Sequence, residues 1–429
     1  MNGLFEIGSL TASLLLAGGL LVAMALAEPR IKRLPLSPAL VYLLCGWAAA
    51  ALATPPLPEV ELPEGSTILR VLSEIAVLLS LFAIGLKIRM GTSWSSWRVP
   101  VLLATLGVMW AALFGTALAW LLLPLTVPQA FLLAALLAPT DPVLASDLQV
   151  QGDHDRDALR LGLSAEGALN DATAYPVVML AFGLLGLHEI SAPAEGLWGQ
   201  PGLRWLLVDL LWSMGAGAVL GLACGRTIGH IMRRKLRAGV SAEWDELLYI
   251  GTIALVDGLA KLVDASPFLA VFAAGATLLR MHPAQRHGED VQDYSQQLLT
   301  FGAQCERLVE VLMVLLIGAG LAQVRWSLPV VLFGIGMVIL VRPLSVLLSL
   351  PGSALSRPQK RLTAWLGIRG VGSVFYLMLA FEEGVKGKEA QLLLSATLVA
   401  IALSIALHGI STTPLMNAYQ RRRAQHRKP

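Results

Sequence analysis

The chain has 429 residues, of which 56% are hydrophobic and only 14% are charged, and its formal net charge is +3. A soluble domain carries about 25% charged residues, so this composition excludes a water-soluble protein and indicates that lipid is the solvent for most of the chain. The three cysteines, Cys45, Cys224 and Cys305, lie in or beside apolar runs without paired spacing, which argues against a disulfide framework or a metal site.

Apolar runs that are long enough to cross a bilayer recur from one end of the sequence to the other. A transmembrane helix needs about 20 mostly apolar residues. We predict thirteen such helices, at residues 5–27, 36–54, 69–88, 99–123, 128–148, 159–187, 203–232, 244–262, 265–280, 299–322, 328–350, 361–383 and 389–415. The first run lacks a basic flank and a small-residue cleavage site, so we interpret it as a helix and not as a signal peptide. The sequence therefore predicts an all-α polytopic membrane protein.

The basic residues between these helices predict how the chain is oriented. When the connecting segments are placed on alternate sides of the membrane, one side carries only Arg325, Lys386 and Lys388, and the other side carries the remaining basic residues of these segments. The positive-inside rule then places the N-terminus outside and the C-terminus in the cytoplasm of a cell (inner) membrane. The basic tail, 416–429, is interpreted as an anchor at anionic lipid headgroups and not as a nucleic-acid patch.

The fifth predicted helix contains a break. Pro139 and Pro142 flank Thr140 and Asp141 in the middle of the span, and two prolines at this spacing interrupt a helix because each removes a backbone donor. In a membrane, broken helix is tolerated only where it is buried in protein or lines an aqueous cavity. The freed carbonyls and the Thr140 hydroxyl are then available to ligate a cation, and a purely structural proline kink is the alternative.

The sixth predicted helix carries three polar residues, Glu166, Asn170 and Asp171, a third to halfway along its length. A charge at the bilayer centre costs at least about 2.5–3.5 kcal/mol, so such residues face a polar cavity or pair with cations from other helices. They mark a candidate transport site or, alternatively, a structural ion-pair network.

Two arginines lie inside later helices, Arg342 in the eleventh and Arg369 in the twelfth. Arginine does not lose its proton in a protein, so each needs an anionic partner or oriented carbonyls. Gly370 and Gly372 follow Arg369, and glycines at this depth permit the helix to unwind. The interrupted helices five and twelve therefore indicate inverted repeats formed by helices 1–6 and 8–13, with helix 7 as a linker.

Four motifs follow one another along the chain: Thr140-Asp141-Pro142, Glu166…Asn170-Asp171, PFLAVFAAGA (267–276) and GIRGVGS (367–373). Together they resemble the monovalent cation:proton antiporter superfamily, and specifically its electroneutral sodium/proton exchangers, over nearly the whole chain. The resemblance implies the sodium/proton antiporter fold with two crossed discontinuous helices. It also implies one transporter unit over residues 1–415, with interleaved dimer and core subdomains, and a homodimer.

The resemblance also implies roles for individual residues. Na⁺ is expected at Asp171, Glu166 and Thr140, with Asn170 beside them. Charge compensation is expected from Arg342 as the partner of Glu166, from Arg369 and from Asp141. In that superfamily an Asn–Asp pair accompanies electroneutral exchange, and this sequence has Asn170 before Asp171. One position departs from the family pattern, because the serine that often follows the glutamate is Gly167.

The predicted function is thus exchange of Na⁺ (or Li⁺) for H⁺, in which both ions compete for Asp171 and no cofactor takes part. A K⁺/H⁺ antiporter on the same scaffold is the nearest alternative. An intramembrane metalloenzyme is disfavoured because His188 and Glu189 lack the second histidine of a zinc motif. A channel is disfavoured because a titratable site suits coupled exchange.

Two further charged clusters lie outside these motifs. Asp257 and Lys261 are four residues apart in the eighth predicted helix, which favours a local ion pair over a role in the ion path. The charged run 153–157 is either a solvated loop with a helix start or a cation-attracting, pH-sensing segment that uses His154.

Overall fold

The computed structural model describes residues 11, 18–19, 21–27, 37–52, 64–88, 94–141, 157–188, 202–238, 245–279, 289–353 and 355–426, and every regular element among them is helical. The elements of the first half are α2 (Pro38–Leu52), α3 (Glu64–Lys87), α4 (Trp94–Leu102), a π-helical turn (Leu103–Gly107), α5 (Val108–Leu122), α6 (Val127–Leu136) and α7 (Ala158–Leu184). Those of the second half are a π-helix (Trp205–Trp212), α8 (Ser213–Arg237), α9 (Asp245–Leu262), α10 (Pro267–Leu278), α11 (Glu289–Gly320), a 3₁₀ turn (Leu321–Gln323), α12 (Leu328–Gly336), a second π-turn (Met337–Val341), α13 (Arg342–Ser349), α14 (Arg357–Trp365), α15 (Val371–Glu382) and α16 (Gly387–His426).

Each predicted range from residue 36 onward overlaps these helices, and two ranges are interrupted. The range 128–148 overlaps α6, which is followed by non-helical chain to residue 141. The range 361–383 covers the end of α14 and all of α15, with a non-helical gap between them. The first range, 5–27, is described only at residues 11, 18–19 and 21–27, which are helical.

The described residues contain five helical spans that are long and apolar enough to cross a membrane, namely Ser66–Lys87, Trp94–Leu122, Trp205–Lys235, Leu328–Ser349 and Gly387–Arg423. Four further apolar helices are shorter: Pro38–Leu52, Val127–Leu136, Pro267–Leu278 and Val371–Glu382. These helices identify a multi-pass membrane protein. The count of thirteen crossings and the orientation of the termini stay predictions.

The short helices next to the breaks begin with strong local signals. α6 starts with a capping box between Thr126 and Gln129, and α14 starts with one between Ser356 and Gln359. Both helices also have proline in their first turn, where the missing N–H is one that has no helical partner. These caps fix the residue at which each helix starts, and the interruption follows the end of the same short helix.

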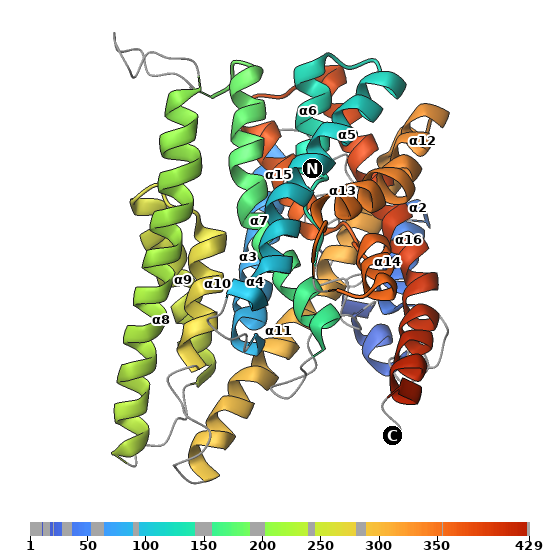
Figure 1. Ribbon diagram of the computed structural model, residues 1–429. Helices are drawn as coiled ribbons and strands as arrows, with labels where there is room; N and C mark the ends of the chain where they lie inside the picture. Colours follow the sequence, from blue (N-terminus) through green and yellow to red (C-terminus); the bar gives the residue numbers. More distant parts are fainter. Residues whose placement is uncertain are drawn as a thin grey trace.

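Small residues let the helices on one side of the molecule approach closely. A Cβ atom added to Gly85 of α3 would lie 2.6 Å from the Phe272 carbonyl oxygen of α10, and one added to Gly275 of α10 would lie 2.5 Å from the Phe82 carbonyl oxygen of α3. Such contacts are the usual way in which membrane helices pack, since lipid supplies no hydrophobic driving force between them. α10 also packs against α8, and Figure 1 shows α8, α9 and α10 side by side at one edge of the molecule.

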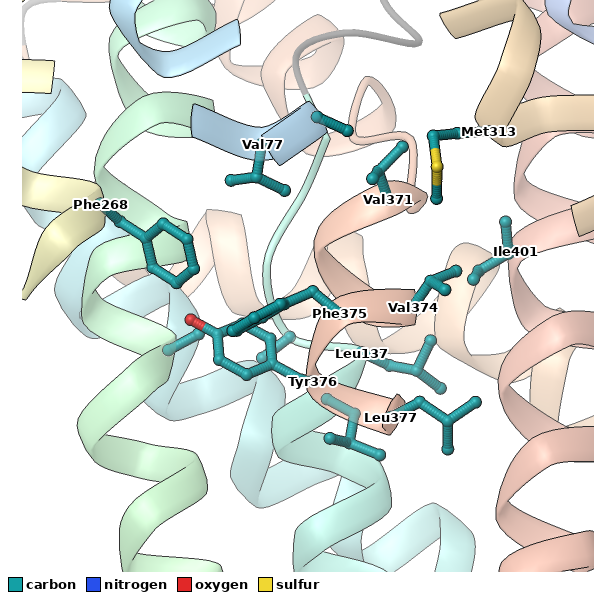
Figure 2. Packing of buried hydrophobic residues seen from close by; sticks show 14 of the residues in the cluster. Val77, Leu137, Phe268, Met313, Val371, Val374, Phe375, Tyr376, Leu377 and Ile401 are labelled. Atoms are coloured by element: carbon teal, nitrogen blue, oxygen red, sulfur yellow. The ribbon is translucent and has the colours of Figure 1, made fainter. Parts of the chain in front are cut away.

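α15 lies at the centre of the packed core. It contacts α3, α6, α7 and α16, and its residues from Val371 to Met378 are all buried. Figure 2 shows side chains of α15 surrounded by Val77, Phe268 and Ile401 from other helices. The rings of Phe268 and Phe375 meet edge to face, with centroids 5.2 Å apart, a favoured aromatic geometry. A charged or polar group beside this helix is therefore shielded from lipid and from bulk water.

The last helix extends beyond its predicted end. The apolar run predicts an end at residue 415, whereas α16 continues to His426. The extension has partners of its own, because Tyr419 hydrogen-bonds Asp157 and Gln359, and Arg423 forms an ion pair with Asp157. The basic end of the chain is therefore held against the start of α7, which sequence periodicity does not reveal.

Candidate functional site

The first interrupted segment follows α6. The helix ends at Leu136, and residues 137–141 continue as non-helical chain. Thr140 and Asp141 lie in this part, and each is only 6% exposed. The predicted break is present at this point, and Pro142, the second proline of the motif, lies outside the described residues.

The second interrupted segment joins α14 to α15. Residues 366–370 are not helical and include Arg369, whose side chain is fully buried. The break agrees with the expectation that glycines allow the twelfth predicted helix to unwind. It leaves the last carbonyls of α14 and the first N–H groups of α15 without partners in their own helices. They need other partners because residues 366–370 are buried.

The two interrupted segments bind each other. The Asp141 N–H donates to the Ile368 carbonyl at 2.7 Å, and the Val371 N–H donates to Asp141 Oδ2 at 2.6 Å. In return, Arg369 Nε donates to the Leu137 carbonyl at 2.5 Å. An acidic side chain thus lies at the N-terminus of α15 and a basic side chain at the C-terminus of α6, the favourable arrangement for both helix dipoles. Asp141 and Arg369 therefore lie where charge compensation of the broken helix ends is predicted.

Arg342, at the start of α13, pairs with Glu166 of α7. Its two terminal nitrogens donate to the two carboxylate oxygens at 2.5 and 3.1 Å, and Glu166 is 1% exposed. Arg342 Nη2 also donates to the carbonyls of Thr363 and Leu366 at the end of α14. The guanidinium therefore joins three elements. Because both oxygens of Glu166 are used by Arg342, this structure favours the predicted pairing over direct ligation of a cation by Glu166.

Asn170 and Asp171 lie on the buried side of α7 that faces both interrupted segments. Asn170 Nδ2 donates to Thr140 Oγ1 at 2.8 Å, which joins α7 to the chain after α6. Gly372 of α15 lies next to Asp171, since a Cβ atom added there would be 2.7 Å from Asp171 Oδ1. The structure thus brings the predicted residues Thr140, Asn170 and Asp171 together.

The carboxylate of Asp171 is buried without a cationic partner. It is 4% exposed, and among the described residues no hydrogen bond or ion pair reaches its oxygens. Asn170 Oδ1 and Ser373 Oγ are likewise buried without a hydrogen-bond partner. A buried carboxylate in this situation is neutralised by a proton or by a bound cation. The site therefore has the chemistry to hold either one.

Tyr376 is a member of the site that sequence reasoning missed. Its hydroxyl donates to the main-chain carbonyl of Asp171 at 2.5 Å. Figure 2 shows the Tyr376 hydroxyl directed toward a neighbouring helix. The bond fixes α7 against α15 at the position of the carboxylate. A tyrosine in an apolar run carries no signal of this role.

The other charged residues form separate clusters. The predicted Asp257–Lys261 ion pair is present at 2.9 Å, and Lys261 also contacts Glu74 at 2.8 Å. Asp157 accepts a hydrogen bond from the Leu159 N–H and so caps the start of α7, whereas residues 153–156, with His154, lie outside the described residues. His188 contacts Asp209, and Glu189 lies outside the described residues. The part of the chain that the structure describes contains no group of three His, Cys, Asp or Glu residues able to hold a metal ion.

Comparison with known proteins adds a family and a fold. Residues 19–418 match the model of a family described as sodium/hydrogen exchanger, transmembrane. The Na⁺/H⁺ antiporter NhaP of Pseudomonas aeruginosa is 27% identical over 418 residues, which cover 90% of this chain and 92% of that protein. The K⁺/H⁺ antiporter NhaP2 of Shewanella sp. (strain MR-4) is 25% identical over 410 residues, covering 94% of this chain and 66% of that protein.

The fold is that of a solved antiporter structure. The sodium proton antiporter MjNhaP1 from Methanocaldococcus jannaschii superposes with a TM-score of 0.69 at 21% identity, over 97% of this chain and 98% of that one. The chain spans between about a quarter and two thirds of the length of the first curated relatives that it matches.

Proposed function

Because the chain belongs to the transmembrane sodium/hydrogen exchanger family, we propose that it is a secondary active antiporter that exchanges Na⁺ (or Li⁺) for H⁺. Its relatives and its fold are those of transporters and not of enzymes. One observation supports the proposal most strongly: Asp171 is a buried carboxylate that no arginine, lysine or histidine side chain of the described residues neutralises.

Asp171 is the carrier in this mechanism. When it is ionised, it binds a dehydrated cation with help from Thr140, whose hydroxyl accepts a hydrogen bond from Asn170 and is thereby oriented. When it is protonated, it has no net charge with which to hold the cation. The proton and the cation therefore exclude each other from one carboxylate, and this exclusion couples their fluxes in opposite directions.

Electroneutral exchange follows from the charges around the carrier. Glu166 is paired with both terminal nitrogens of Arg342, so these two charges compensate each other while Asp171 changes its ligand. Asn170 is neutral and donates to Thr140, so it adds no second proton. One proton then replaces one monovalent cation, and no net charge crosses the membrane.

The rest of the molecule would provide the movement that exposes Asp171 to each side in turn. We propose that the interrupted segments and α7 form the core subdomain, which rocks against a dimer subdomain within one unit over residues 1–415. The helices 1–6 and 8–13 would be the inverted repeats, and two chains would form a homodimer with the C-termini in the cytoplasm.

A K⁺/H⁺ antiporter is the second candidate, because some relatives of similar identity bear that name. Gly167 lies where the family often has serine, so one side-chain ligand is missing and the cation preference does not follow from the fold. Proton flux driven by Na⁺, Li⁺ and K⁺ in the same vesicles distinguishes the two candidates.

The proposal is tested by replacing Asp171→Asn in proteoliposomes that contain a pH-sensitive dye. We expect cation-dependent proton flux to be abolished, because asparagine neither ionises nor takes up a proton. The matched control is Asp264→Asn, since Asp264 is exposed and its left-handed backbone (φ 52°) suits asparagine. Cation-dependent exchange that persists in Asp171→Asn would remove Asp171 as the carrier.

A further inference from the structure

His408 is a fully buried histidine in α16 that faces the second interrupted segment. Its Nδ1 lies 2.7 Å from the Ser404 carbonyl oxygen of its own helix, and its Nε2 lies 2.8 Å from the Trp365 carbonyl oxygen, at the end of α14. The imidazole also packs against the Trp365 indole, with ring centroids 5.7 Å apart. The ring is therefore fixed between two helices.

His408 and Ser404 hold the two ends of the interrupted segment. Ser404 lies one turn before His408, and its hydroxyl accepts a hydrogen bond of 3.0 Å from the Arg369 N–H. His408 contacts Trp365, immediately before the segment, and Ser404 contacts Arg369 near its end. A single face of α16 thus sets the span of residues 366–370.

A short chain of contacts joins His408 to the helix that carries Asp171. Leu366, the neighbour of Trp365, accepts a hydrogen bond of 2.9 Å from Arg342 Nη2. The same guanidinium binds both oxygens of Glu166 on α7. Any shift of the end of α14 away from His408 therefore changes the position of Arg342 and, through Glu166, of α7.

The protonation state of His408 decides how many of its contacts are hydrogen bonds. The nearest partner of each nitrogen is a carbonyl oxygen, which only accepts, and the Ser404 hydroxyl lies farther away, 3.3 Å from Nδ1. A neutral imidazole donates from one nitrogen alone. In the neutral ring one nitrogen lone pair faces a carbonyl oxygen, and in the protonated ring both nitrogens donate. The charged groups around the ring are Arg369 from the interrupted segment and Arg342 from α13, and the C-terminal end of α14 faces it as well.

We propose that His408 is a positioning residue of the exchange site, which holds the end of α14 more tightly when both ring nitrogens carry protons than when one proton is lost. The inference rests on the proposed exchange at Asp171. It adds a proton-dependent contact that acts through Arg342 and Glu166, outside the carboxylate that carries the ions.

Two substitutions separate the two contacts of the ring. His408→Gln places an amide N–H₂ near the position of Nε2, so the contact with the Trp365 carbonyl is kept without a titrating group. His408→Asn places the amide near Nδ1 and does not reach Trp365. His230→Asn is the matched control, because His230 is exposed on α8 and its hydrogen bond among the described residues is to Arg226 of its own helix.

The variants are compared by Na⁺-dependent proton flux in proteoliposomes over a range of pH. We expect His408→Asn to raise the half-saturating Na⁺ concentration by about 2- to 10-fold, the effect of one lost hydrogen bond. We expect His408→Gln to keep the wild-type value within about 2-fold, but to change the pH profile. If His408→Asn does not fold, the pH profile of His408→Gln alone decides the question.

Several results would overturn the inference. An unchanged half-saturating concentration in a folded His408→Asn, an unchanged pH profile in His408→Gln, or an equal loss in both variants would each contradict it. Failure of the proposed function is recognised separately. If the wild type shows no cation-dependent proton flux, the exchange itself is absent; if the wild type exchanges, only His408 is in question.

Discussion

Gly372 brings the backbone of α15 directly against the carboxylate of Asp171. No side chain fits between them, because a Cβ atom at residue 372 would lie 2.7 Å from Asp171 Oδ1. Contacts this short force a shift of the helix or of the carboxylate. The glycine is therefore part of the site, although it has no functional group.

We expect Gly372→Ala to reduce the exchange rate by at least about 10-fold, because a misplacement of about 1 Å in a functional site has effects of this size. Gly162→Ala is the matched control on α7, since its added Cβ would make an ordinary contact of 3.6 Å with Val99. The measurement is initial proton flux in proteoliposomes with equal amounts of folded protein. Equal rates for Gly372→Ala and the wild type would contradict this role.

The charged and polar members of the site could be predicted from sequence, because each of them interrupts an apolar run. Glu166, Asp171 and Arg369 stand out for this reason alone. Tyr376 and His408 could not be predicted, since their roles depend on partners that lie 205 and 43 residues away. A tyrosine or a single histidine in a buried helix is ordinary until those partners are known.

At the scale of elements, the buried ion pair between Glu166 and Arg342 joins α7 to α13 and α14. Removing one partner leaves the other charge buried and unpaired, which costs about 3–5 kcal/mol, whereas replacing both with neutral groups is far less costly. The pair therefore fixes the arrangement of these three elements as well as the charge of the site.

We expect Glu166→Gln to lower the stability of the protein by about 3–5 kcal/mol, measured by denaturation in detergent. We expect the double variant Glu166→Gln with Arg342→Met to recover most of this loss. Exchange should stay impaired in the double variant, because α14 then lacks the Arg342 contact. If the double variant loses as much stability as the two single variants together, the loss does not come from an unpaired charge, and the role of the Glu166–Arg342 ion pair is contradicted.

The breaks in the two interrupted helices were also predictable, since prolines mark one and glycines the other. Their mutual binding was not. The contact between Asp141 and Val371 joins residues 230 positions apart, and the sequence holds no sign of which N-terminus an aspartate will face. The long α16 is a similar case, because its last turns depend on Asp157, at the start of a different helix.

At the scale of the whole molecule, composition alone indicates a polytopic membrane protein, and the described residues agree with it. The number of crossings is harder to derive. Within the described residues, five apolar helices are long enough to cross a membrane, whereas several others are too short to cross it by themselves. Short helices such as α6 and α15 end or begin at the interrupted segments of the candidate site.

Electroneutral exchange makes a prediction for the intact transporter. If one proton replaces one monovalent cation, no charge moves, so an imposed membrane potential does no work on the cycle. We expect the initial rate in proteoliposomes to be the same with and without a potassium diffusion potential, with Na⁺ as the exchanged ion. A clear dependence on voltage would refute the role assigned to Asn170.

Competition for Asp171 is tested most directly by the protons released when the cation binds. The purified protein in detergent and weak buffer is titrated with Na⁺ (or K⁺, if K⁺ drives exchange) while the pH of the solution is recorded. We expect that binding releases protons, with at most one per site, and that Asp171→Asn releases none. Binding of the cation without proton release, or equal release by Asp171→Asn, would contradict it.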